Sequence, residues 1–248
     1  MPRKPRKPRW YFSLRSPYSW FAFRDLLERY PDVLADAEWI PYWEPDPAGE
    51  KALLDRDVRL PVVPMSKAKN LYILQDTKRT ATARGWGMTW PVDRTPHWEV
   101  PHLAYLAAVD EGLGRAFVEA VYRARWTQGR NISDRQVIAE IAAQVGTDPV
   151  RAAGAADDPR LRERGLDCLV SAYRDDAFGV PYFVSGRDRF CGAERVPGWV
   201  DAVRAARAPE PVRDHSPVQP ERIPALVGFT AATRSAAVVD HSHAGGCG

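Results

Sequence analysis

The pattern of apolar residues near the N-terminus changes its period at one point. A run of apolar residues over 10–14 predicts a short buried strand. From Tyr18 onward the apolar side chains recur at helical spacing, which predicts a helix that begins near Pro17. Ser16 would be the N-cap, because a capping hydroxyl and a proline without an N–H are both favoured there. The unpaired N–H groups and the helix dipole at this turn would stabilise an anion, particularly a thiolate.

The rest of the pattern is mostly helical. A second strand is predicted over 36–42, and the proline-rich and charged residues 43–66 are predicted to be irregular. Helical periodicity then predicts helices over 67–84, within 99–146, over 158–176 and over 196–206. Two short strands joined by a tight turn at 185–188 predict a β-hairpin before the last helix.

Composition narrows the class of protein. With 45% hydrophobic residues and nine tryptophans the chain is globular, and its formal charge of +3 is close to balance. Much of the excess lies in residues 1–9, where basic residues alternate with proline, so we expect a solvated tail rather than a nucleic-acid contact. No stretch approaches the roughly 20 apolar residues of a membrane span, and we expect no signal peptide. We expect a cytoplasmic protein with no membrane partner.

Cysteine and histidine positions form no metal or dithiol motif. Cys168, Cys191 and Cys247 are widely spaced, so neither a dithiol redox centre nor a cysteine zinc site is predicted. His241 and His243 near Cys247 are metal-capable types, but no fourth ligand follows in fixed spacing. We therefore predict no metal site.

Three segments resemble one protein family. Ser16-Pro17-Tyr18-Ser19 stands where thioredoxin-like proteins of the DsbA type carry Cys-Pro-X-Cys, and RSPYSWFAF resembles the SPYSW segment of kappa-class glutathione transferases and 2-hydroxychromene-2-carboxylate isomerases. The pattern K-x2-Y-x3-D-x2-R-x-A-x3-G over 69–85 and the segment AVYRARWTQGRNISD over 120–134 are similar to segments of the same branch. The resemblance runs from about residue 10 to residue 207.

The predicted element order fits this resemblance. It implies an α/β, thioredoxin-like fold with an inserted all-helical domain. Residues 10–45 and 166–207 would form the thioredoxin-like domain, and 46–165 the helical insertion. Residues 1–9 would be a basic tail, and 208–248 a mobile C-terminal tail.

The resemblance also implies a site that binds a thiol cofactor. In these families a serine replaces the redox cysteine and its hydroxyl holds the sulfur of the bound thiol, which gives Ser16 the catalytic role. Glutathione lies along a strand that follows a cis-proline. Pro181 stands at that place, and the backbone of Val180 would pair with the tripeptide.

Further residues would complete the site. Lys69 would supply positive charge to a carboxylate of thiol or substrate. Glu194, preceded by Ala193, stands where the family has an acid that opens the last helix and binds the γ-glutamyl ammonium. Tyr18 and Trp20 are placed to stack on a flat aromatic substrate.

Departures from the family pattern leave alternatives open. Glu194 is one methylene longer than the family's aspartate, Ala193 lacks a side-chain donor, and an asparagine has no clear counterpart within 46–64. The cofactor is therefore glutathione, another low-molecular-weight thiol, or none. The favoured function is a thiol-dependent isomerase or transferase acting on a conjugated aromatic or polyketide-type substrate, as a homodimer by analogy with the relatives.

Two other functions remain open on the sequence alone. One is a non-redox thioredoxin-fold protein, without a thiol cofactor, that binds a peptide or assists a biosynthetic pathway. The other is a biosynthetic protein in which the thiol of Cys191 or Cys247 reacts covalently.

Overall fold

The computed structural model describes residues 6–61 and 65–207. The tail predicted over 208–248, with Cys247 and its neighbouring histidines, lies outside the described residues. Of the basic tail predicted over 1–9, residues 1–5 also lie outside the described residues. Arg9 belongs to the first strand instead, and the carbonyl of Pro8 accepts the Glu38 N–H at 2.8 Å.

A mixed four-stranded sheet in the order β2-β1-β3-β4 forms the centre of the fold. β1 and β2 are parallel, and the β1–β3 and β3–β4 pairs are antiparallel. The strands are β1 (Arg9–Phe12), β2 (Glu38–Pro41), β3 (Tyr182–Ser185) and β4 (Asp188–Cys191). The first two are shorter than predicted. The predicted hairpin is confirmed as β3 and β4, which are joined across Gly186 and Arg187.

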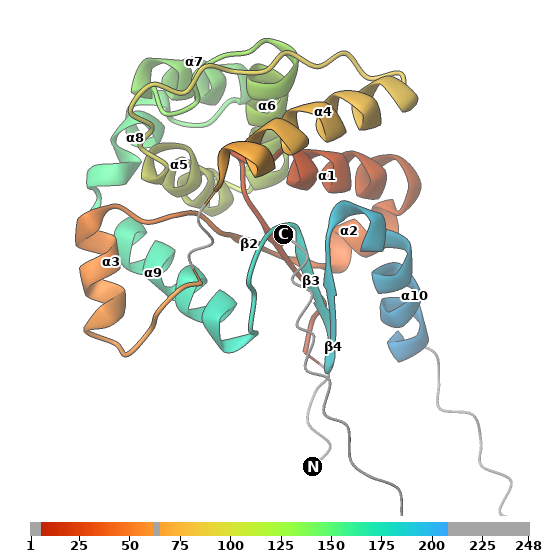
Figure 1. Cartoon of the computed structure of the whole chain (residues 1–248). Coiled ribbons are helices and arrows are strands. Elements are labelled where there is room, and N and C mark those ends of the chain that lie inside the picture. The colour runs from red at the N-terminus through yellow and green to blue at the C-terminus, as the bar shows by residue number, and fades with distance from the viewer. Residues whose placement is uncertain (1–5, 62–64, 208–248) are drawn as a thin grey trace, which may run out of the picture. The chain divides into compact units, whose positions relative to one another are not determined.

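Helices make up most of the remaining described chain (Figure 1). The α-helices are α1 (Pro17–Arg29), α2 (Pro31–Asp36), α3 (Pro47–Leu54), α4 (Lys67–Ala83), α5 (Glu99–Asp110), α6 (Gly114–Tyr122), α7 (Arg135–Val145), α8 (Pro149–Gly154), α9 (Pro159–Arg174) and α10 (Val196–Arg207). A π-helical turn, η1 (Arg123–Thr127), follows α6, and two short 3-10 turns are η2 (Ala155–Asp157) and η3 (Ala193–Arg195). The helices predicted around α1, α4, α9 and α10 are confirmed.

The prediction that residues 43–66 are irregular is wrong for α3. Asp46 is the N-cap of that helix and accepts the Gly49 N–H at 2.7 Å, while Pro47 occupies the first helical position. This arrangement favours a helix start even in a proline-rich segment. The short helix contacts α9, so tertiary packing supports an element too short to be stable alone.

Alternate side chains of the sheet enter two different layers. Trp10 and Phe183 face α1 and α10, where Phe183 meets Trp199 at a ring separation of 4.8 Å. Tyr11 and Tyr182 face α9 on the other side. Since successive strand residues point to opposite faces, this alternation buries both faces of the sheet.

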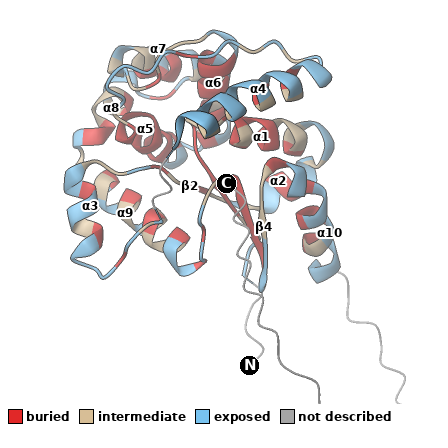
Figure 2. Cartoon of the chain, in the orientation of Figure 1, coloured by how far each residue is buried: buried red, intermediate tan, exposed pale blue. Residues whose placement is uncertain are grey.

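The larger apolar cluster extends from one face of the sheet into the helices inserted between β2 and β3 (Figure 2), and a smaller one lies between the other face and α9. The boundary predicted at 165/166 falls inside α9, at Gly165, where an added Cβ would meet Leu103 and Trp43 at 2.7 and 2.9 Å. A residue without a side chain therefore allows α9 to approach α5 closely. The insertion is continuous with the thioredoxin-like part and shares its core.

Candidate functional site

The hydroxyl of Ser16 lies where α1 begins. Ser19 N–H donates to Ser16 Oγ at 3.2 Å, and Trp20 N–H donates to the Ser16 carbonyl at 3.1 Å, which confirms the predicted N-cap. Pro17 has no N–H, so Tyr18 N–H is the first-turn donor left without an acceptor among the described residues. Ser16 is half-buried, and its hydroxyl proton has no acceptor among the described residues, so it is available to a ligand.

A buried histidine holds the turn that leads to Ser16. His102 on α5 donates from Nδ1 to the Trp98 carbonyl at 2.6 Å, so its Nε2 is the acceptor for the Leu14 N–H at 3.0 Å. Burial lowers the pKa of His102 to about 3. The imidazole is therefore neutral near neutral pH, which this pair of hydrogen bonds requires.

The π-helical turn and α6 hold the same turn from another side. Tyr122 donates its hydroxyl to the Ser13 carbonyl at 3.1 Å, and Arg125 donates from Nε to the Arg15 carbonyl at 3.3 Å. Arg125 is only 2% exposed, and a bidentate ion pair with Asp93 at 2.9 and 2.7 Å compensates its charge. The inserted helices thus set the position of the Ser16 backbone.

The Val180–Pro181 segment lies beside this turn. Its peptide bond is cis, and the Pro181 carbonyl accepts the Gly192 N–H at 3.0 Å. The register of β1 and β3 pairs Tyr11 with Tyr182, so its continuation places Val180 level with Ser13, at the start of the turn that ends at Ser16. The predicted proline and serine segments are therefore neighbours.

The acidic residue predicted at the last helix lies in η3, which contacts α1. Glu194 is exposed, and its carboxylate folds back over Gly192, which has a φ of 104°. Ala193 is buried, so it can offer a ligand little more than its backbone. Arg195 approaches the Glu194 carboxylate at 3.8 Å, a distance that leaves the acid available to a cationic group.

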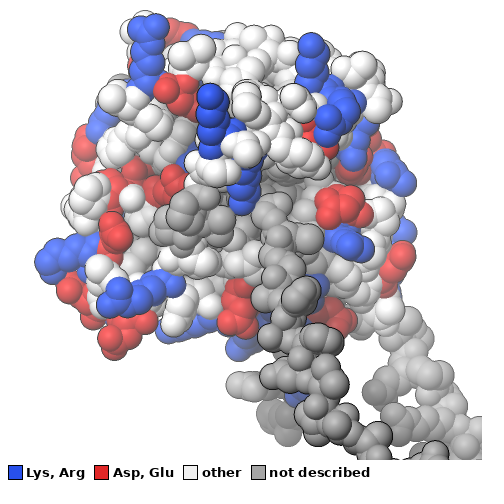
Figure 3. Space-filling view, viewed as in Figure 1, with Lys and Arg blue, Asp and Glu red and all other residues white. Residues whose placement is uncertain are grey.

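Helix α4 is tied to α1 beside the site. Tyr18 donates its hydroxyl to Asp76 at 2.7 Å, and burial together with this bond raises the Tyr18 pKa. Asp76 also pairs with Arg79 at 3.1 Å, at i, i+3 spacing on the helix. Lys69 is in the first turn of the same helix, and that turn contains no acidic residue. Figure 3 shows basic side chains over this end of α4.

Trp20 lies in the core and is not exposed at the candidate site. It is 3% exposed, and the rings of Trp86 and Trp126 pack against it at 5.9 and 6.2 Å. A flat substrate would reach this ring only if those neighbours moved. Of the two predicted substrate residues, Tyr18 is the accessible one.

Several residues that position Ser16 were missed by the sequence analysis. They are Ser13, Asp93, His102, Tyr122 and Arg125. No local signal singled them out: the stretch 117–126 also carries Glu119 and Arg123, so the charge of Arg125 does not set it apart.

Comparison with known families agrees with this geometry. A family model described as the DSBA-like thioredoxin domain matches residues 9–204. The chain belongs to this family. The membership confirms the predicted family and fold, and no curated protein matches the chain.

Solved structures show the same DSBA-like fold. A 2-hydroxychromene-2-carboxylate isomerase is 22% identical with a TM-score of 0.62, covering 81% of this chain and 96% of its own. A probable DsbA oxidoreductase from Streptomyces coelicolor is 18% identical with a TM-score of 0.59, covering 88% and 99%. The cytosolic disulfide reductase DsbM from Pseudomonas aeruginosa with GSH is 22% identical with a TM-score of 0.54, covering 81% and 96%. At such identities the likeness establishes the fold.

No helix in the described ranges is both long and apolar enough to cross a membrane.

Proposed function

We propose that this DSBA-like protein is a thiol-dependent isomerase, or a glutathione-transferase-like enzyme, acting on a conjugated aromatic or polyketide-type substrate. The observation that carries the proposal is the half-buried Ser16 hydroxyl at the start of α1, with its proton free for a ligand. The likeness to a 2-hydroxychromene-2-carboxylate isomerase and to a disulfide reductase with GSH supports it.

Ser16 cannot exchange disulfides, but it can stabilise a thiolate that a cofactor supplies. With serine at both 16 and 19, the motif has no sulfur to attack a disulfide. A sulfur beside Ser16 would accept hydrogen bonds from the Ser16 hydroxyl and the Tyr18 N–H, at the positive end of the α1 dipole. These donors would lower the pKa of the bound thiol and increase the fraction of nucleophile near neutral pH.

The rest of the thiol would lie between the cis-proline segment and two charged side chains. The backbone of Val180 would pair with a peptide-like thiol such as glutathione. Glu194 would bind its ammonium and Lys69 a carboxylate. A thiol cofactor of this kind requires a compartment that keeps it reduced, in line with the cytoplasmic location expected from the sequence.

The proposed reaction needs no oxidant or reductant. The thiolate adds to a conjugated enone, so a C–S bond forms as the C=C π bond opens to an enolate. Rotation about the new single bond follows, and elimination breaks the C–S bond and restores both the alkene and the thiolate. Tyr18, half-buried and bound to Asp76 at 2.7 Å, would form a wall of the substrate site.

Glutathione binding to the full chain tests the proposal. Calorimetry gives the affinity, and the thiolate absorbance of the bound cofactor against pH gives its pKa. We expect the wild type to lower that pKa, and Ser16→Ala to bind about tenfold more weakly and lose the shift, because one charge-assisted hydrogen bond is removed. Equal affinity and pKa in the two proteins would refute the role of Ser16.

The matched control is Asp134→Ala. Asp134 caps α7 by accepting the Gln136 N–H at 2.8 Å. Asp134→Ala therefore removes a helix cap, as Ser16→Ala does, but the cap belongs to a different helix and is far from Ser16 in the sequence. This variant should bind glutathione like the wild type. If a substrate is turned over unchanged after all small thiols are removed, a function without a cofactor replaces the one proposed.

A further inference from the structure

Three metal-ligating side chains meet outside the Ser16 site. They are Asp46, the N-cap of α3, together with His97 and Glu99 at the start of α5. His97 Nε2 lies 3.4 Å from Glu99 Oε2 and 3.6 Å from Asp46 Oδ2, and the three atoms are all within 4.8 Å of one another. No sequence motif connects these residues, because Asp46 is distant from the other two along the chain.

The spacing of these atoms fits a tetrahedral ion. Zinc binds histidine nitrogen and carboxylate oxygen at about 2.0–2.2 Å, and tetrahedral geometry then separates two ligand atoms by about 3.4 Å. Both distances from His97 Nε2 are close to this value. One imidazole and two carboxylates are also a ligand set suited to zinc or a similar transition metal.

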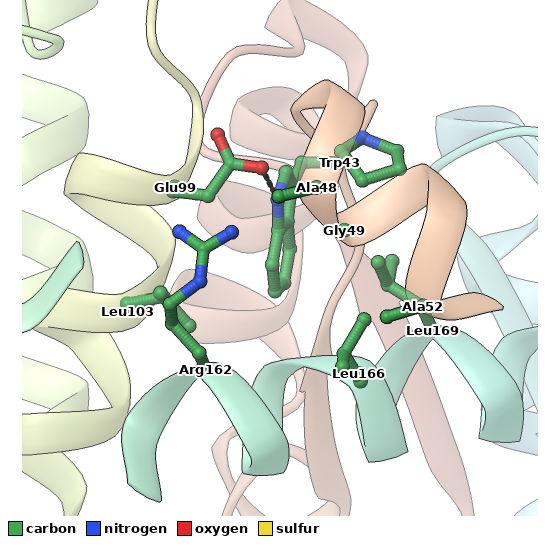
Figure 4. A pocket seen from close by; sticks show the side chains of 10 residues that line it. Trp43, Ala48, Gly49, Ala52, Glu99, Leu103, Arg162, Leu166 and Leu169 are labelled. Carbon is green, nitrogen blue, oxygen red and sulfur yellow. Dashed lines mark hydrogen bonds between the residues drawn. The ribbon is translucent and has the colours of Figure 1, made fainter. Parts of the chain in front are cut away.

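Glu99 is a buried carboxylate aimed into the cluster. It is 4% exposed, and its Oε1 accepts both the Trp43 Nε1–H, at 3.3 Å, and the Asp46 N–H. Figure 4 shows the bond from Trp43 to Glu99. Among the described residues Oε2 receives no further hydrogen bond and faces His97. A buried carboxylate with one oxygen so placed would be stabilised by a positive charge beside it.

Asp46 is held in place by groups behind it. Gly49 N–H donates to Oδ1, and Arg162 donates to both oxygens at 2.8 and 2.9 Å. Although burial opposes ionisation, the Gly49 and Arg162 hydrogen bonds outweigh it and lower the pKa of Asp46. Outer groups that orient ligating side chains in this way are typical of metal sites.

We propose that Asp46, His97 and Glu99 bind a divalent transition-metal ion, best matched by Zn²⁺, with solvent completing its coordination. His97 is 43% exposed on its side chain, so an ion can enter from water. The rival arrangement has no metal, with His97 in direct contact with the two carboxylates. Arg162 lowers the affinity for a cation through its charge, so we expect binding weaker than that of a structural four-ligand zinc site.

The ion would have a structural role. Trp43, which orients Glu99, stacks on His102 with ring centres 5.1 Å apart and an interplanar angle of 15°. Bound metal would therefore fix the segment after β2 against α5. We expect it to raise the melting temperature of the protein and to leave glutathione binding unchanged.

Metal binding by the full chain, without any thiol, tests the proposal. After treatment with a chelator, the protein is titrated with Zn²⁺ by calorimetry, and with Co²⁺ while visible absorbance is recorded. We expect one site, intense tetrahedral Co²⁺ bands and a higher melting temperature with Zn²⁺. In His97→Gln and Glu99→Gln the affinity should fall at least about tenfold and the melting-temperature rise should vanish.

Two comparisons keep the result unambiguous. Glu99→Gln keeps an oxygen for the Trp43 and Asp46 donors, so it tests the ligand while retaining the fold, which circular dichroism verifies. A variant with His241→Gln, His243→Gln and Cys247→Ser removes the group of metal-capable residues near the C-terminus and should bind like the wild type. Binding that is lost in that variant, or equal in His97→Gln and wild type, would overturn the proposal.

Discussion

Ser16 and Ser19 stand at the two cysteine positions of the family motif, yet their surroundings give them different roles. Ser19 is fully buried, and its Oγ accepts the Ser13 N–H at 3.2 Å. Ser16 is half-buried and has a proton to donate. The outer position is thus the one that a ligand can reach, while the inner one secures the turn.

This difference predicts the behaviour of cysteines placed at the two positions. Ser16→Cys should have a thiol pKa well below the ordinary ~8.5, because the start of α1 stabilises a thiolate. Ser19→Cys should be protected from alkylation by burial. The measurement is the rate of iodoacetamide reaction against pH, with the native cysteines subtracted by parallel wild-type runs. A Ser16→Cys thiol that titrates at or above 8.5 would contradict the assigned electrostatics.

The buried His102 predicts that the folded protein becomes less stable in acid. Burial lowers its folded pKa to about 3, whereas the unfolded value is near 6.5, so between these values the unfolded chain binds a proton that the folded chain does not. The unfolding free energy contributed by this group is complete above pH 6.5 and falls as pH is lowered toward 3, by up to ~1.4 kcal/mol per pH unit.

Urea unfolding of wild type and His102→Gln across that range measures the effect. Glutamine does not titrate but can still accept a hydrogen bond, so the variant should lose less stability between pH 6.5 and pH 4 than the wild type. Parallel pH curves for the two proteins would show that His102 does not control this loss.

At the scale of elements, the turn between β1 and α1 is positioned from outside its own βαβ unit. Its backbone bonds to His102 of α5, Tyr122 of α6 and Arg125 of η1. Arg125 in turn is fixed by Asp93, from the segment between α4 and α5. The inserted helices therefore build the frame of the Ser16 site.

Local patterns were enough to predict α1, its serine cap and the hairpin, since each depends on residues adjacent in sequence. They were not enough for α3, because the proline-rich and charged composition predicted an irregular segment and the Asp46 cap was not recognised. The side chains that support Ser16 left no local signal, because each depends on a contact across the fold. Trp20 shows the same limit: its place in the motif says nothing of the rings that cover it.

The Arg125–Asp93 pair predicts a large cost for one substitution. Asp93→Ala would leave the Arg125 guanidinium, 2% exposed, without its counter-charge. We expect the unfolding free energy to fall by about 3 kcal/mol. This value is near the low end for buried pairs, because Asp93 is a quarter exposed. The matched control is Asp157→Ala, which breaks a bidentate but exposed pair with Arg135. It should cost less than ~1 kcal/mol in the same urea measurement. Equal losses would show that burial of Arg125 does not matter.

At the scale of the whole molecule, one large apolar cluster joins the sheet to the inserted helices. The cluster that contains Trp10 and Trp199 beside the sheet also contains Trp98 and Trp126 of the inserted part. The close approach of α9 to Leu103 and Trp43 at Gly165 joins the two further. Separate unfolding of the insertion would expose apolar surface on both sides of this contact, at a cost that scales with the area exposed.

We therefore expect the chain to unfold in a single cooperative transition despite its inserted arrangement. Tryptophan fluorescence and far-ultraviolet circular dichroism should give the same urea midpoint. Trp199→Phe, beside the sheet, and Trp126→Phe, in the insertion, should each lower that common midpoint, because each trims a fully buried side chain of one cluster. Two midpoints, or a variant that shifts the signal of only one region, would show that the insertion is a separate folding unit. In that case the Ser16 turn would lose its supporting bonds before the sheet unfolds, and ligand binding would fail at a lower urea concentration than the fold itself.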